Sequence, residues 1–106
     1  MASENVLNLT ESNFSDTISQ GLTLVDFWAS WCQPCLALAP MIDQLADAHH
    51  EKIKVAKVDV DSNPSIPGQF GIRGIPTVIL FKDGQPVDQY VGNNPGAIKE
   101  MVEKVI

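Results

Sequence analysis

Two cysteines separated by two residues are the most reactive feature of the sequence. Cys32 and Cys35 are the only cysteines among 106 residues, and they lie between an apolar run and a segment with helical spacing. A disulfide at this spacing opens and closes with little backbone movement, because the second cysteine lies about one helical turn after the first. Cys32 faces unpaired N–H groups at the predicted helix start, which favour its thiolate, so it is the predicted nucleophile. Cys35 is the predicted resolving thiol.

Two other interpretations of this pair compete with a redox role. A static disulfide would close a very short loop and would add little stability. A zinc site would have to combine Cys32 and Cys35 with His49 and His50, but adjacent histidines lack the gap of three to five residues that tetrahedral sites use. We therefore predict a redox disulfide and no metal site.

A carboxylate within an apolar strand is the second chemical candidate. Asp26 lies in the middle of the run 22–28, which is otherwise almost entirely apolar or β-prone. Burial should raise its pKa toward neutrality, where it can exchange a proton with a thiol. Lys57 interrupts the apolar segment 55–58. It could shift the pKa of the Asp26 carboxylate directly or interact with it through water. A purely structural ion pair between the two is the alternative.

Alternating strands and helices must position these groups. Strands are predicted over 5–9, 22–28, 53–60, 77–82 and 86–91, and Asp83-Gly84 should join the last two as an antiparallel hairpin. The nearly continuous apolar character of 22–28 is typical of a strand covered on both faces. The order of elements predicts an α/β fold with a mixed sheet, in one domain spanning 1–106.

The predicted helices have recognisable ends. Thr10 should cap the first, a second should run from the cysteine pair to about His50, and 61–70 should hold at most a short one. Asn94 should cap the last helix, whose apolar face should include Val105.

Composition excludes several classes of function. The chain has 7 Lys+Arg against 13 Asp+Glu, a net charge of -6, so it should bind neither nucleic acid nor an anionic membrane surface. It has no apolar run of about 20 residues and no basic start followed by an apolar stretch, so we expect neither a membrane span nor a signal peptide. We therefore expect a cytoplasmic chain whose partners are proteins or small molecules.

The segment 25–35, Val-Asp-Phe-Trp-Ala-Ser-Trp-Cys-Gln-Pro-Cys, resembles the active site of the thioredoxin family. The similarity continues through Ala39-Pro40, 55–59 and 70–77 and covers essentially the whole chain. It implies the thioredoxin fold, a five-stranded mixed β-sheet flanked by four helices, and a monomeric general protein disulfide reductase. It also implies no bound cofactor, with electrons from NADPH passing through a partner, thioredoxin reductase, to disulfide-containing protein substrates.

The resemblance also assigns roles to individual residues. It makes Cys32 the nucleophile, Cys35 the resolving thiol, Asp26 the buried base and Lys57 the partner of that base. It makes Pro76 a cis proline beside the disulfide, although base rates favour trans. The surface on which a substrate strand would dock is implied to comprise Trp31, Gln33, Pro34, Gly74, Ile75, Pro76 and Gly92.

Two positions depart from the usual family pattern. Gln33 replaces glycine before the motif proline, and Leu36 replaces lysine after the second cysteine. Because Leu36 removes a positive charge near the thiolate, we predict a higher pKa for Cys32 than in relatives that carry lysine. Gln33 should shift the reduction potential, in a direction that we do not predict. Pro34 favours a reductant by resemblance; a thiol oxidant, an isomerase, a glutaredoxin or a non-enzymatic adaptor are the alternatives.

Overall fold

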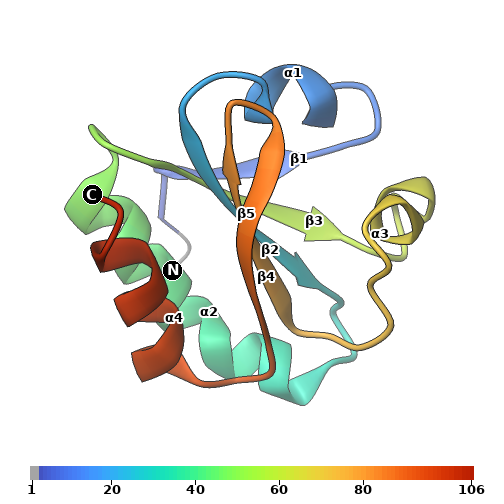
Figure 1. Cartoon of the computed structure of the whole chain (residues 1–106). Helices are drawn as coiled ribbons and strands as arrows, with labels where there is room; N and C mark the ends of the chain where they lie inside the picture. Colours follow the sequence, from blue (N-terminus) through green and yellow to red (C-terminus); the bar gives the residue numbers. More distant parts are fainter. Residues whose placement is uncertain (1–2) are drawn as a thin grey trace.

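A five-stranded mixed β-sheet with helices on both faces forms the molecule (Figure 1). The computed structural model describes residues 3–106. The strands are β1 (Val6–Leu9), β2 (Leu22–Trp28), β3 (Lys54–Asp59), β4 (Thr77–Lys82) and β5 (Gln85–Val91). The helices are α1 (Phe14–Ile18), α2 (Gln33–His49), α3 (Ser65–Gln69) and α4 (Pro95–Glu103). The predicted mixed sheet and four helices are thus confirmed.

β2 is the central strand of the sheet and is covered on both faces, as its apolar character predicts. The strand order is β1-β3-β2-β4-β5, with β1, β3 and β2 mutually parallel and β4 antiparallel to both β2 and β5. Five of the seven residues of β2 are fully covered by protein. A chain segment that is buried on both faces and at both edges can vary little in position, so β2 provides a rigid base for the loop and the helix after it.

Each face of the sheet has its own apolar layer. On one face, α2 and α4 pack through residues such as Leu38 and Ile98 against Leu24 of β2. On the other face, α1 and α3 pack through Phe14 and Ile66 against the neighbouring residue Val25. Figure 1 shows the same division, with α2 and α4 together on one side and α1 and α3 on the other. Because side chains alternate along a strand, Asp26 points to the same face as Leu24, beneath α2.

Two helix ends differ from the prediction. Asn13, rather than Thr10, is the N-cap residue of α1; its side chain accepts a hydrogen bond from the backbone N–H of Thr10 at 2.7 Å. The last helix ends at Glu103, so Val105 lies beyond it and is exposed. Local polar contacts and fraying set these ends, and helical periodicity does not encode either.

The topology brings three chain segments together at the end of the sheet where β2 finishes. β2 ends at Trp28, and because β4 is antiparallel to it, Thr77 at the start of β4 pairs with Phe27 at the end of β2. Val91 at the end of β5 pairs in turn with Thr77. The loop before α2, the loop before β4 and the turn after β5 therefore meet at this end of the sheet.

Candidate active site

Cys32 and Cys35 are joined as a disulfide at the amino-terminal end of α2. Their Cα atoms are 5.2 Å apart, within the usual range for a disulfide. Both residues are buried, Cys32 at 5% and Cys35 at 2% exposure, and they pack with Ala29. The pair therefore lies at the predicted helix start, and protein covers most of both cysteines, so a partner can reach only the small exposed part of Cys32.

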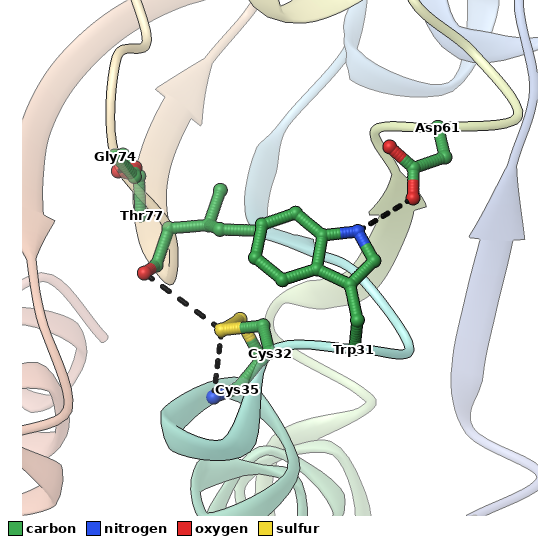
Figure 2. Close-up of a disulfide and its surroundings, with 7 residues drawn as sticks. Trp31, Cys32, Cys35, Asp61, Gly74 and Thr77 are labelled. Atoms are coloured by element: carbon green, nitrogen blue, oxygen red, sulfur yellow. Dashed lines mark hydrogen bonds between the residues drawn. A yellow bond between two sulfur atoms is a disulfide. The ribbon is translucent and has the colours of Figure 1, made fainter.

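The sulfur of Cys32 is the N-cap of α2. It accepts a hydrogen bond from the backbone N–H of Cys35 at 3.2 Å, and Gln33 and Pro34 occupy the first helical positions (Figure 2). Proline is suited to this turn because its missing N–H would have no helical partner there. The N–H of Cys35 and the positive end of the helix dipole favour a negative charge on Cys32 Sγ. The cap therefore stabilises a thiolate once the disulfide is opened.

The loop before β4 faces the disulfide. The Ile75–Pro76 peptide bond is cis, as the resemblance implies. The carbonyl oxygen of Ile75 lies 3.8 Å from Cys32 Sγ; this is a contact and not a hydrogen bond, because a disulfide sulfur carries no hydrogen. Gly92 is held beside this loop by a 2.8 Å hydrogen bond from its N–H to the carbonyl of Pro76. The structure thus places Ile75 against Cys32, with Pro76 and Gly92 adjoining Ile75.

Exposure separates these neighbours of the disulfide into two groups. Gln33, Pro34 and Gly74 are exposed, whereas Pro76 is buried. A partner can therefore reach the backbone around Gly74 and Ile75 more readily than the ring of Pro76. Val91, which the sequence analysis did not single out, is 58% exposed next to Gly92 and enlarges the apolar surface.

Trp31 is the most exposed large apolar side chain among the described residues of the site. It is 66% exposed, and its indole N–H donates a hydrogen bond to the carboxylate of Asp61 at 2.8 Å. Figure 2 shows the indole ring beside the disulfide, with its nitrogen turned toward Asp61. Asp61 was missed by the sequence analysis. It follows β3, whose carboxyl end lies beside that of the parallel strand β2, and this adjacency is the signal that points to it.

Asp26 is buried, and neither of its carboxylate oxygens has a hydrogen-bond partner among residues 3–106. Burial raises the pKa of Asp26 to about 7, and the positive charge of Lys57 opposes this rise. The two residues are register partners on β2 and β3. Lys57 is half-buried, with its ammonium 5.1 Å from the centre of the Trp28 ring. The predicted carboxyl group with a pKa near neutrality is therefore present beneath α2.

The zinc alternative does not fit this geometry. His49 lies 14 residues after Cys35 on the same helix, which separates the two by about 21 Å along the axis. In the described part of the chain, no group of three His, Cys, Asp or Glu side chains is arranged to hold a metal ion. His49 instead approaches Glu103 of α4, with 4.0 Å between Nε2 and Oε2.

Replacing the apolar residue after Cys35 by lysine should make the thiolate easier to form. Leu36 is 41% exposed, and its backbone N–H bonds the carbonyl of Cys32 at 3.1 Å. An ammonium at this position would favour the negative charge on Cys32, so Leu36→Lys should move the thiolate titration of the reduced protein about half a pH unit toward acid. Ultraviolet absorbance or alkylation rate against pH measures this. Ala37→Lys, at an exposed position turned further from the sulfur, is the control, and a titration that does not move in Leu36→Lys contradicts the prediction.

These features define a class of protein. A CxxC disulfide at a helix start, a facing cis-proline loop and a mixed sheet with helices on both faces are the arrangement of a thiol–disulfide oxidoreductase. The thioredoxin family model matches residues 5–104. A thioredoxin of Staphylococcus saprophyticus is 47% identical over 100 residues, covering 93% of this chain and 96% of its own. One of Chlorobaculum thiosulfatiphilum is 52% identical over 99 residues, covering 92% and 89%.

A solved structure agrees with the fold. The thioredoxin of Malassezia sympodialis, Mala s 13, matches with a TM-score of 0.87 and 30% identity, over 98% of this chain and 93% of its own. The chain belongs to the thioredoxin family. It is a thiol–disulfide oxidoreductase with protein-disulfide reductase activity, and it carries electrons through the redox pair Cys32–Cys35.

One broader property comes from the family and another from the helices of this chain. Its members typically bind no cofactor of their own and are reduced by a thioredoxin reductase. Across residues 3–106, none of the helices combines the length and the apolar character that a membrane crossing requires.

Proposed function

We propose that Cys32 is the attacking thiolate and Cys35 the resolving thiol of this reductase. Cys32 attacks a sulfur of the substrate disulfide, which forms a mixed disulfide and releases one substrate thiolate. Cys35 then loses its proton and attacks Cys32 Sγ, which releases the second substrate thiolate and forms the Cys32–Cys35 disulfide. Two electrons have then passed from the protein to the substrate. The observation that carries this assignment of roles is the 3.2 Å hydrogen bond by which the Cys32 sulfur caps α2.

Asp26 is the proposed acceptor of the Cys35 proton. A base is needed only in the second step, when Cys35 must ionise inside the protein. A carboxyl group with a pKa of about 7 is ionised in a substantial fraction of molecules at neutral pH and can still hold a proton. Lys57 is the proposed partner of this base. Its positive charge limits the cost of ionising Asp26.

The proposed docking surface surrounds the disulfide. It consists of Trp31, Gln33, Pro34, Gly74, Ile75, Pro76 and Gly92. Exposed backbone near Gly74 and the exposed indole of Trp31 support it, because a strand-like segment can pair with backbone while its side chains contact an apolar surface. Recognition through backbone depends little on substrate sequence, so the proposed substrates are many different disulfide-containing proteins.

We further propose that a thioredoxin reductase supplies electrons from NADPH, and that the chain acts as a cytoplasmic monomer whose 106 residues form one domain. The test is NADPH-dependent reduction of insulin disulfides. Turnover should require both this protein and a thioredoxin reductase, and glutathione with glutathione reductase should not replace that reductase. Efficient reduction by glutathione would instead place the protein with the glutaredoxins. A measured reduction potential close to those of strong oxidants would favour an oxidant or an isomerase.

An adaptor role predicts a different result. A Cys32→Ser, Cys35→Ser double variant, which cannot carry electrons, would then keep full biological activity in cells that lack the natural protein. Loss of that activity is the expected result.

A further inference from the structure

A groove beside α2 reaches Lys57 from the surface. It has a volume of about 480 Å³, enough for many water molecules. It is lined by Leu36, Ala39, Pro40, Asp43, Gln44, Asp47 and Lys57. Most of the α2 residues recur at intervals of three or four and so form one stripe along the helix. The groove therefore joins solvent, one flank of α2 and the lysine that is paired in register with Asp26.

Asp43 is the unusual residue of this groove. Its side chain is half-buried, and its Oδ1 atom is covered by protein without a hydrogen-bond partner among the described residues. A covered carboxylate oxygen without a partner is costly unless a positive charge lies nearby. Of residues 3–106, Lys57 is the only basic one that lines the groove.

The ammonium of Lys57 contacts an aromatic ring and, in the described part of the chain, no carboxylate. Within residues 3–106, it makes no ion pair of 4.0 Å or less, and its ammonium lies against the face of Trp28. Asp26 is its register partner on β2, and Asp43 faces the same groove from α2. One ammonium on a long, flexible side chain is thus adjacent in register to Asp26 and shares a groove with Asp43, and both oxygens of Asp26 and one of Asp43 are covered without a partner among the described residues.

We propose that Asp43 is a positioning residue that shares Lys57 with Asp26. When Asp26 takes up the Cys35 proton it becomes neutral, and the ammonium of Lys57 is drawn toward Asp43. When that proton leaves for solvent, Asp26 regains its charge and attracts Lys57 again. Asp43 thereby lowers the attraction that Lys57 exerts on ionised Asp26 and helps that group to keep a proton near neutral pH. This proposal deepens the proposed role of Asp26 and rests on it.

Other charged groups near Lys57 have partners of their own. Asp47 lines the same groove one turn further along α2, but it is exposed and accepts hydrogen bonds from Ser3 and from Asn5, the latter at 3.0 Å. His50 at the end of α2 also interacts with Asp47. On β3, Asp59 uses Oδ1 to accept the backbone N–H of Asp61 at 3.0 Å. On β1, the register partner of Lys57 is the uncharged Asn8. Among the carboxylates that line the groove, Asp43 is therefore the one with a covered oxygen that can interact with Lys57.

The test is the titration of the Asp26 carboxyl carbon, followed by NMR in the oxidised protein, where neither cysteine titrates. In Asp43→Asn, Lys57 is released toward Asp26, so the midpoint should move about half a pH unit or more toward acid. Asp43→Glu keeps the carboxylate and should stay near the wild-type midpoint. In a Lys57→Met background, the additional effect of Asp43→Asn should fall below half of its value, because the shared ammonium is gone.

Asp47→Asn is the matched control, because it removes the same charge from the same groove and should leave the midpoint in place. An unmoved midpoint in Asp43→Asn overturns the proposal. So does an equal shift in Asp47→Asn, or an undiminished effect of Asp43→Asn in the Lys57→Met background. The NMR titration needs no substrate, so it decides the role of Asp43 even if Asp26 is not the base. In reduced protein, the pH profile of mixed-disulfide resolution should move in the same direction as the midpoint.

Discussion

Cys32→Ser is expected to abolish protein disulfide reduction. A serine hydroxyl at the N-cap of α2 can accept the hydrogen bond from the N–H of Cys35, so the helix should keep its first turn. It cannot supply a thiolate, and the first attack on a substrate disulfide therefore has no nucleophile. The rate of NADPH-coupled insulin reduction should fall by about 10³-fold or more, to the background without this protein.

Cys35→Ser is the companion variant, and it separates the two steps. Cys32 can still attack, but nothing resolves the product, so a mixed disulfide between Cys32 and the substrate should accumulate and be visible on non-reducing gels. Turnover should be lost in both variants, whereas the trapped complex should form only with Cys35→Ser. A complex trapped through Cys35 in the Cys32→Ser variant would reverse the assignment of nucleophile and resolving thiol.

Asp26→Asn should make the oxidised protein more stable at alkaline pH. In the folded protein, burial raises the pKa of Asp26 from 3.8 to about 7. A raised carboxyl pKa means that folding favours the protonated form. Its contribution to stability is fully present below about pH 4 and is lost as pH rises through about 7. The loss amounts to about 4 kcal/mol, and an asparagine, which does not ionise, avoids it.

Urea unfolding at pH 4, 6 and 8 measures this effect. The advantage of Asp26→Asn in free energy of unfolding should grow by about 4 kcal/mol from pH 4 to pH 8. Asp16→Asn, on the exposed side of α1, makes the same change in charge without burial and should show no such growth. A difference between Asp26→Asn and wild type that is constant with pH would show that Asp26 is ionised in the folded state with an ordinary pKa.

Much of the site was predictable from the sequence because its chemistry is encoded locally. Cys32 and Cys35 are three residues apart, and the strand before them and the helix after them each have a clear pattern. Asp26 stands out because it interrupts an apolar strand, and burial then dictates the direction of its pKa. The cis bond at Pro76 is implied only by the resemblance, since propensity alone favours trans.

The residues that escaped prediction act across the fold. Asp61 matters because its carboxylate meets the indole of Trp31, 30 positions earlier in the chain. Asp43 matters because one flank of α2 lies over Lys57, and helical periodicity does not say which strand a flank will meet. Thr10 and Asn13 are both residue types that cap helices, and only the backbone shows that α1 begins after Asn13. Contacts of this kind depend on tertiary packing, which a local pattern does not specify.

The sulfur cap of α2 has a consequence for how electrons are routed. In the disulfide, Cys32 Sγ accepts the N–H of Cys35, and a thiolate at the same place accepts it more strongly, so the helix needs no new cap after reduction. We therefore expect the oxidised and reduced forms to present nearly the same outer shape. If the proposed reductase and the substrates both dock around the disulfide, they compete for one surface, and the shape of that surface does not distinguish the oxidised from the reduced protein. The relative reduction potentials and concentrations of the two partners then decide the direction of electron flow.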